Sequence, residues 1–138
     1  AIHPQIEIKT KDAREVLPKE ILLKDAVTQW ANVGGLIAGL YANNYELIGH
    51  SLVDIIVEPA RKNLIPLFDV VKQNAINAGA LGAGISGSGP TIFALCKGDV
   101  IAKKVFEAIQ HNYKNTGIEA TAFISKVNNE GIKILEKK

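Results

Sequence analysis

A glycine-rich stretch from Gly79 to Thr91 constrains this chain more than any other segment. It reads Gly-Ala-Leu-Gly-Ala-Gly-Ile-Ser-Gly-Ser-Gly-Pro-Thr and holds five of the twelve glycines of the chain. Because glycine has no side chain to pack, a dense run of it indicates that the backbone itself must approach another group closely. Ser86 and Ser88 add hydroxyl groups to a row of backbone N–H donors. The stretch favours contact with an anion, and the alternative is a glycine-rich hairpin that binds nothing.

The common phosphate-binding motifs do not fit this stretch. Gly82, Gly84 and Gly87 spell G-x-G-x-x-G, but the dinucleotide fingerprint follows a strand and opens a helix. Here the stretch follows a helical segment and leads into a strand-like apolar run. A P-loop needs Gly-Lys-Ser/Thr, and no lysine lies between Lys72 and Lys97. A nucleophile elbow is excluded because its strand–turn–helix setting is missing.

Composition and charge exclude several classes of function. The 138 residues suit one domain, and 16 basic against 14 acidic side chains, spread along the chain, predict no nucleic-acid binding. The most apolar window, 30–42, is shorter than the roughly 20 residues that span a bilayer. The three histidines are scattered and Cys96 is the single cysteine, so we expect no metal site, no internal disulfide and a reducing compartment such as the cytoplasm. The apolar neighbours of Cys96 predict a buried thiol.

Hydrophobic periodicity predicts an alternation of strands and helices. The expected elements are a strand at 6–10, helices at 11–16, 22–41, 45–57 and 66–79, a strand at 91–96, a helix at 99–113, and strands at 118–124 and 132–135. With two strands about the glycine stretch, this order predicts an α+β fold, a ferredoxin-like split β-α-β sandwich. Within the long helix we expect Trp30 in the core, and Gly34, Gly35 and Gly39 to permit close packing of a neighbouring element.

Two arginines occupy positions that suit ligand binding. Thr10 and Arg14 lie four residues apart at a strand-to-helix turn, although Thr10 can equally cap the helix and Arg14 can be a solvated surface charge. Arg61 lies in a segment bracketed by two prolines, which holds its planar guanidinium ready for a carboxylate or a phosphate. The alternative for Arg61 is a surface basic pair with Lys62.

Three segments together resemble one family of small-molecule kinases. Residues 82–91 resemble the third motif of the GHMP kinases. Residues 58–66, Glu-Pro-Ala-Arg-Lys-Asn-Leu-Ile-Pro, and residues 10–18, Thr-Lys-Asp-Ala-Arg-Glu-Val-Leu-Pro, resemble the homoserine kinases within that superfamily. The resemblance covers almost the whole chain, but only the C-terminal domain of such an enzyme, which is ferredoxin-like in the family.

The resemblance implies a reaction and a set of site residues. Members of the family transfer the γ-phosphate of Mg-ATP to the hydroxyl of L-homoserine, in threonine biosynthesis. Thr10 and Arg14 match substrate-binding positions, and Arg61 matches an arginine that grips the substrate carboxylate. The phosphate site is shaped in the family by the glycine loop, which here provides Gly84, Ser86, Gly87, Ser88 and Gly89.

The chain also departs from the family pattern. The first motif and the second, Pro-x-x-x-Gly-Leu-Gly-Ser-Ser-Ala, are missing, and the chain starts at Ala1 and contains no methionine. We therefore expect residues 1–138 to be the C-terminal domain alone, inactive by itself, with ATP and Mg²⁺ bound mainly by an absent N-terminal domain. No catalytic base can be named. The family also implies a homodimer, and we expect an apolar, association-prone patch where the absent domain would pack.

Two rival interpretations remain open from the sequence. A non-catalytic, ferredoxin-like amino-acid-sensing module explains the fold and the arginines, but not the detailed loop sequence. A mevalonate-type kinase of the same superfamily would require a different substrate segment from the one that contains Arg61.

Overall fold

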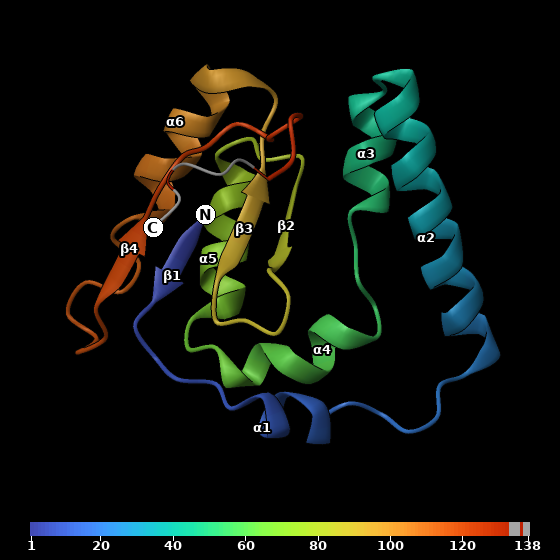
Figure 1. The fold of residues 1–138 in the computed structure, drawn as a ribbon, viewed down its shortest axis with the longest axis horizontal. Helices are drawn as coiled ribbons and strands as arrows, with labels where there is room; N and C mark the ends of the chain where they lie inside the picture. The colour runs from blue at the N-terminus through green and yellow to red at the C-terminus, as the bar shows by residue number, and fades with distance from the viewer. Residues whose placement is uncertain (133–135, 137–138) are drawn as a thin grey trace.

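A four-stranded antiparallel sheet organises the computed structural model, which describes residues 1–132 and 136. The strands are β1 (Ile2–Pro4), β2 (Gly82–Ile85), β3 (Ile92–Leu95) and β4 (Ala120–Ala122), in the order β2-β3-β1-β4 (Figure 1). Ile2 pairs with both Ile92 and Ala122, which sets the register of the central strand. Antiparallel pairing in this order is the split β-α-β arrangement. The prediction of an α+β, ferredoxin-like fold is therefore confirmed.

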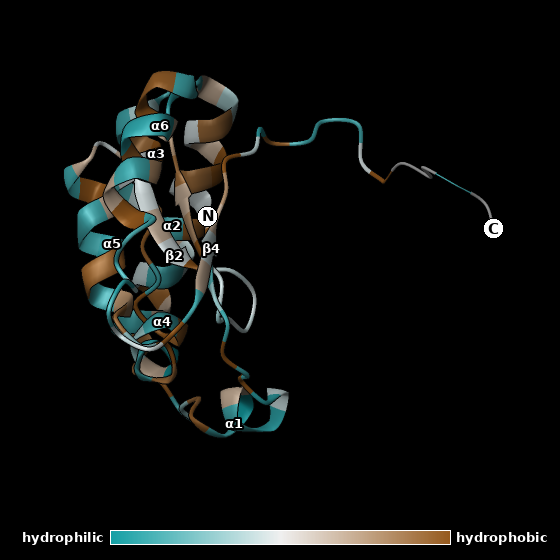
Figure 2. Cartoon of the chain, turned by 90° about the vertical axis from the view of Figure 1, so that its left-hand side faces the viewer, coloured by the Kyte–Doolittle hydropathy of each residue, from teal (hydrophilic) through white to brown (hydrophobic). Residues whose placement is uncertain are grey.

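Helices α5 (Phe68–Asn77) and α6 (Gly98–Ile109) pack against each other, and α5 also contacts β2 and β3. Their apolar faces meet the sheet in one core. The core is built from large buried side chains of the sheet and of both helices, among them Ile2, Ile92, Phe68, Val71, Val105 and Ile109. Residues 123–127 still lie against β3 and α6, and after them the described chain runs away from the domain (Figure 2).

In the sequence, the remaining helices come after β1 and before α5. They are α1 (Thr10–Glu15), α2 (Leu23–Ala42), α3 (Tyr45–Ser51), α4 (Val57–Arg61) and a 3₁₀ turn, η1 (Lys62–Leu64). The hairpin of α2 and α3 stands beside β2, with α2 outermost, while α1 and α4 lie together at one end of the molecule (Figure 1). Among the described residues no helix is long and apolar enough to cross a bilayer.

Two of the three glycines of α2 permit its close packing on α3. A Cβ added to Gly35 would overlap Ser51 Oγ, and one added to Gly39 would lie 3.0 Å from the backbone nitrogen of Ile48. These two glycines were predicted to have this role, and the prediction is correct for them. It is wrong for Gly34, which has nothing within 4 Å of an added Cβ and lies exposed.

Several predicted boundaries are wrong, for local reasons. The first strand lies at 2–4 rather than at 6–10, because a turn in which Ile6 donates to the carbonyl of Pro4 ends the pairing. The helix predicted at 45–57 stops at Ser51, because Asp54 Oδ1 accepts from the amides of Ile56 and Val57 and starts α4. The helix predicted at 99–113 ends at Ile109. Of the predicted strand at 132–135, residues 133–135 lie outside the described residues.

Two predicted burials are also wrong. Trp30 was expected in the core and is instead 66% exposed, because the face of α2 that packs on α3 is the one that carries Gly35 and Gly39. Cys96 is half-buried rather than buried. Burial of its thiol raises the pKa, and the charge of the chain's amino group acts in the opposite direction to a smaller extent.

Candidate functional site

Arg61, at the end of α4, joins the parts of the chain that the sequence singled out. Its Nε donates a hydrogen bond to the carbonyl oxygen of Ala13 at 2.9 Å, and its Nη1 donates to the carbonyl oxygen of Gly87 at 3.2 Å. Ala13 is buried in α1, between the predicted site residues Thr10 and Arg14. The guanidinium therefore brings α1 and the glycine loop together.

These two bonds leave part of the Arg61 guanidinium unused. Arginine carries five N–H donors in a planar fork, and Ala13 and Gly87 take two of them. The other donors belong to the two terminal nitrogens, and the side chain is half-buried. Arg61 can thus hold the backbone and still offer a charged, two-pronged donor to a carboxylate or a phosphate.

The turn between β2 and β3 is closed by backbone hydrogen bonds. Ser86 donates to the carbonyl of Thr91 at 2.8 Å, and Gly89 donates to the carbonyl of Ser86 at 3.0 Å. Gly87 and Gly89 have φ values of +62° and +84°, in the left-handed region that favours glycine. The backbone conformation of the turn therefore favours glycine at positions 87 and 89.

The loop retains hydrogen-bonding groups that the protein does not use. Within the described residues, the amides of Gly87 and Ser88 and the hydroxyls of Ser86 and Ser88 make no hydrogen bond. Ser86 and Gly87 are exposed, and Ser88 is half-buried. Two amides and two hydroxyls beside an arginine suit an anion.

Gly84 differs from the other loop residues. It lies in β2, is buried, and pairs with Phe93. A Cβ added there would lie 3.2 Å from Glu58 Oε2 and 3.3 Å from the ring of Phe93. The structure therefore gives Gly84 the role of a packing residue under the site, whereas Ser86, Gly87, Ser88 and Gly89 form the turn.

Thr10 and Arg14 lie on α1, and both are exposed. Thr10 is the first residue of the helix and its side chain makes no capping hydrogen bond. In the described part of the chain, the Arg14 guanidinium makes no ion pair or hydrogen bond, so its charge is free to meet a ligand. The alternative that Thr10 caps α1 is thus wrong.

An ion pair that the sequence analysis missed holds α4, the helix that carries Arg61. Lys72 of α5 pairs with Glu58 of α4, and the two side chains are only 25% and 14% exposed. Glu58 opens the Glu-Pro-Ala-Arg segment, which was singled out for Arg61 alone. The pair fixes α4, and with it Arg61, against α5. Only the tertiary contact shows that Lys72 belongs to this arrangement, because the two residues are 14 positions apart.

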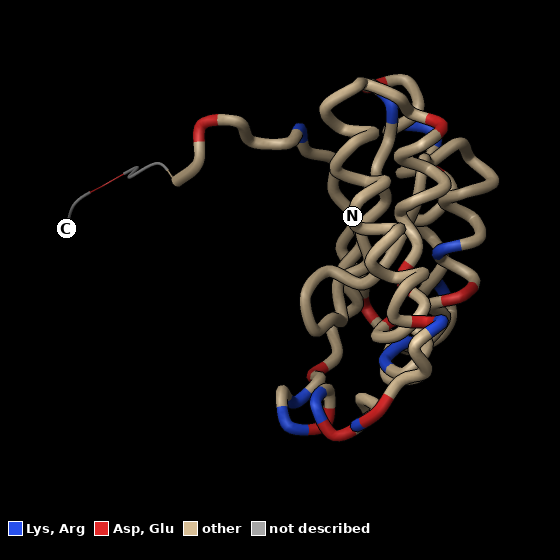
Figure 3. Tube along the Cα trace, turned by 90° about the vertical axis from the view of Figure 1, so that its right-hand side faces the viewer, with Lys and Arg blue, Asp and Glu red and all other residues tan. Residues whose placement is uncertain are grey.

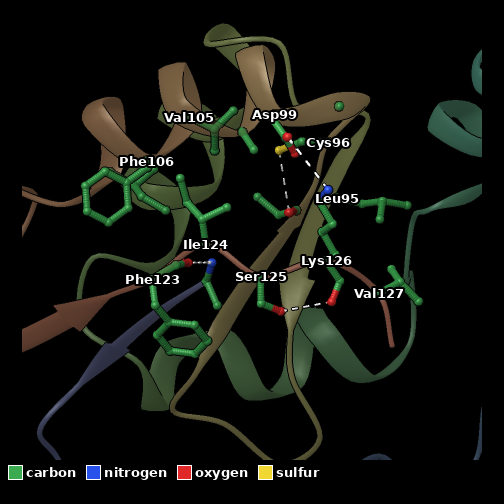
Figure 4. A pocket seen from close by; sticks show the side chains of 15 residues that line it. Leu95, Cys96, Asp99, Val105, Phe106, Phe123, Ile124, Ser125, Lys126 and Val127 are labelled. Carbon is green, nitrogen blue, oxygen red and sulfur yellow. Dashed lines mark hydrogen bonds and ion pairs between the residues drawn. The ribbon is translucent and has the colours of Figure 1, made fainter. Parts of the chain in front are cut away.

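A cavity of about 400 Å³ lies elsewhere, between β3, α6 and residues 123–127 (Figure 4). It contains Cys96, whose thiol donates to the carbonyl of Ala94 at 3.7 Å, and an exposed ion pair of Lys126 with Asp99. None of the predicted site residues lines it. Among the described residues, no three histidines, cysteines or carboxylates gather as a metal site would require.

Comparison with known families identifies the type of domain. The family model for the C-terminal region of GHMP kinases matches residues 36–115. The matched segment includes α4, the glycine loop and the strands on either side of it.

Curated proteins give more specific relatives. The chain is 48% identical to a homoserine kinase of Chlorobium phaeobacteroides (strain BS1) over 136 residues, which cover 97% of this chain and 42% of that protein. It is 41% identical to a homoserine kinase of Pyrococcus furiosus over 126 residues, or 91% of this chain and 42% of that protein. The chain thus spans less than half the length of these relatives.

A solved structure to which this chain is similar is also that of a homoserine kinase. The crystal structure of homoserine kinase from Cytophaga hutchinsonii ATCC 33406 superposes with a TM-score of 0.91 and 53% identity, over 94% of this chain and 41% of that one. Fold, family model and relatives lead to the same result: this chain belongs to the GHMP kinase family and corresponds to its C-terminal region.

Proposed function

We propose that this chain is the substrate-binding part of a homoserine kinase, which transfers the γ-phosphate of ATP to the hydroxyl of L-homoserine in threonine biosynthesis. The observation that carries the proposal is the position of Arg61, which ties α1 to the glycine loop and keeps donors free. The homoserine kinase names of the relatives supply the substrate.

In this proposal the carboxylate of homoserine binds the free donors of Arg61, and the unpaired charge of Arg14 lies on the neighbouring helix with Thr10. Charge-assisted bonds of this kind fix both position and orientation. Holding one end of a small amino acid aims its hydroxyl at the phosphate. Such positioning supplies much of the rate enhancement in phosphoryl transfer.

The turn formed by Ser86, Gly87, Ser88 and Gly89 has the complementary role. Its unused amides and hydroxyls stabilise negative charge on the transferred phosphoryl group. The homoserine oxygen bonds to the γ-phosphorus, the bond to the bridging oxygen breaks, ADP leaves, and the hydroxyl proton is released. No side chain of this chain is proposed as the base.

The proposal assigns ATP and Mg²⁺ to the part of the longer relatives that this chain does not match. Among the described residues, no three histidine, cysteine or carboxylate side chains gather as a metal site, and the proposal places Mg²⁺ with the ATP. By itself the domain should not turn over. The proposal also places the enzyme in the cytoplasm. It further includes a homodimer, which the family resemblance implies.

A chimeric enzyme tests the proposal. The segment of the Cytophaga hutchinsonii homoserine kinase that this chain does not match is joined to residues 1–138, and transfer from Mg-ATP to L-homoserine is measured. We expect activity in the chimera and none in the isolated domain. Arg14→Leu should raise the KM for homoserine by roughly 10- to 100-fold, because a charge-assisted contact with the substrate is lost. The domain should stay folded, because the Arg14 guanidinium makes no hydrogen bond or ion pair with the described residues.

Two further variants make the test specific. Arg61→Leu should raise the same KM and also destabilise the domain, whereas Lys103→Leu, an exposed lysine of α6, should leave KM and kcat unchanged. A folded chimera that is inert toward homoserine would contradict the proposal. If the isolated domain then bound an amino acid in calorimetry, the amino-acid-sensing module would replace it.

A further inference from the structure

A hydrogen bond links the central strand β1 to the residue that closes the glycine turn. Nδ1 of His3 and the hydroxyl of Thr91 share this bond at 2.7 Å, across 88 positions of sequence, and both residues are partly buried. The backbone carbonyl of Thr91 accepts from the Ser86 amide, which closes the turn between β2 and β3. His3 therefore contacts one end of the turn without belonging to it.

The register of the sheet explains why these two side chains meet. Ile2 of β1 pairs with Ile92 of β3 in the antiparallel direction, so that His3 comes opposite Thr91. On its other side, His3 pairs with Thr121 of β4. Residues directly opposite each other on neighbouring strands project to the same face of a sheet. The side chains of Thr91, His3 and Thr121 therefore lie on one face.

Ser86 extends this line of polar residues to the turn. Ile85 pairs with Ile92, and the amide of Ser86, one residue further along, donates to the carbonyl of Thr91. We call these four residues the polar row: Ser86, Thr91, His3 and Thr121. The neighbouring row belongs to the core or packs against it, and consists of Ile85, Ile92, Ile2 and Ala122. Because side chains alternate between the faces of a sheet, the polar row lies on the face away from the core.

The sheet offers His3 no charged neighbour on its own strands. None of the four described strands contains lysine, arginine, aspartate or glutamate, and the charged residues lie on the helices and connecting segments (Figure 3). Within the described part of the chain, the imidazole makes no hydrogen bond besides the one to Thr91. That bond is therefore the contact through which His3 can act on the site.

The turn needs restraint from outside. Two of its residues, Gly87 and Gly89, are glycines in the left-handed region, and glycine resists a change of backbone conformation less than any other residue. Arg61 restrains the turn at Gly87, by donating to its carbonyl oxygen. His3 restrains it at Thr91, where the chain enters β3. The two contacts approach the turn from different elements, α4 and β1.

We propose that His3 is a positioning residue for phosphoryl transfer, which holds the turn in place through Thr91. This role rests on the proposed function, because the turn affects catalysis only if it receives the phosphoryl group. A fixed Thr91 side chain fixes the carbonyl to which Ser86 donates, and so the direction of the free amides and hydroxyls of the turn. Donors that are already in place stabilise developing charge without rearranging during the reaction.

Amide hydrogen exchange on the 138-residue chain tests the contact without reference to activity. His3→Leu removes the bond, whereas the amide of His3→Asn keeps a polar atom near the position of Nδ1. We expect the Ser86 amide to exchange roughly 10-fold faster in His3→Leu, because its acceptor on Thr91 is loosened, and at the original rate in His3→Asn. The Leu81 amide, which donates to Leu95 at the far end of the same strand pair, is the internal control and should not change.

The chimera with the remainder of a homoserine kinase gives the catalytic test. His3→Leu should lower kcat by roughly 10- to 100-fold, as a small misplacement of catalytic groups does. The KM for homoserine should stay the same, because Arg14 and Arg61 are unchanged. His3→Asn should recover most of kcat. The matched control is His111→Leu, at an exposed histidine beyond α6, which should leave both constants unchanged.

Substitutions of Thr91 test the bond from its other end. Thr91→Val removes the hydroxyl and should reproduce the effects of His3→Leu, whereas Thr91→Ser keeps the hydroxyl and should resemble the original protein. The double variant H3L/T91V should be no worse than either single variant, because all three lack the same interaction. If His3→Leu does not fold by circular dichroism, Thr91→Val replaces it in both experiments.

The two experiments separate the possible failures. An unchanged Ser86 exchange rate in His3→Leu, or an equal acceleration at Leu81, would overturn the restraint of the turn by His3. An active chimera whose kcat is insensitive to His3→Leu, or is not recovered by His3→Asn, would overturn the catalytic role. A chimera that is inert with His3 intact would contradict the proposed function, and the catalytic role with it. The exchange rates would still decide whether His3 holds the turn.

Discussion

Arg61 Nε donates to the carbonyl oxygen of Ala13 at 2.9 Å, across 48 residues of sequence. The same guanidinium reaches the carbonyl of Gly87 through Nη1. One side chain at the end of α4 therefore sets the position of α1 and of the glycine loop. Its consequences can be measured on the domain alone.

Substitution of Arg61 by lysine should loosen α1. A lysine ammonium keeps the charge but lacks the planar fork that reaches both carbonyls. We expect Arg61→Lys to lower the free energy of unfolding by about 1–2 kcal/mol, as the loss of hydrogen bonds from a charged group does. Urea denaturation measures this. Limited proteolysis should show faster cleavage within residues 10–22, and unchanged cleavage there would contradict the clamp.

The two turn glycines should differ in their tolerance of alanine. At Gly89 an added Cβ would lie 2.9 Å from Ile65 Cδ1 and φ is +84°, so Gly89→Ala combines overlap with backbone strain. At Gly87 φ is +62° and an added Cβ meets nothing within 4 Å. We expect losses of about 3 kcal/mol at Gly89 and about 1 kcal/mol at Gly87. Equal thermal stabilities for the two variants would refute this assignment.

The ion pair of Glu58 with Lys72 should show strong coupling. Lys72→Met leaves a carboxylate that is 14% exposed without its partner, and should cost about 2 kcal/mol of unfolding free energy. Adding Glu58→Gln removes the stranded charge and should recover part of that loss. The control is Lys11→Met, in a pair with Glu15 that is 81% and 63% exposed, where about 0.5 kcal/mol or less is expected.

Tyr113 should make the stability of the domain depend on alkaline pH. Its hydroxyl donates to the carbonyl of Pro66 at 2.7 Å, and burial raises the pKa of Tyr113 to about 12 from the ordinary 10. A raised pKa in the folded state stabilises the protein fully below pH 10, and this contribution is lost as the pH rises from 10 to 12.

The matched variant for this effect is Tyr113→Phe, which does not titrate. The difference in unfolding free energy between the two proteins should be constant below pH 10 and should shrink by about 2 kcal/mol by pH 12. Cys96, whose pKa is also raised by burial, is present in both proteins and cancels. A pH-independent difference would show that Tyr113 is not the titrating group.

Much of the fold could be predicted from the chain itself. Apolar periodicity located α2, α5 and α6, and glycine or proline marked several of their ends, because these features depend on local backbone geometry. The glycine loop and Arg61 were also visible, since left-handed turns and a stiff, proline-bracketed arginine have local sequence signals.

Other features followed from contacts between distant residues. The alternation at 6–10 reports which side chains are partly buried, but not whether a neighbouring strand pairs there, so β1 was misplaced. Gly84 belongs to β2 because Phe93 lies opposite it, and Lys72 joins the site region through Glu58.

Trp30 shows the limit most clearly. The sequence by itself determined that α2 has an apolar face, because the spacing of its residues fixes which of them share a side of the helix. Only the tertiary structure decided which side is covered. Gly35 and Gly39 let α3 approach one side closely, and the apolar side that carries Trp30 was left facing outward.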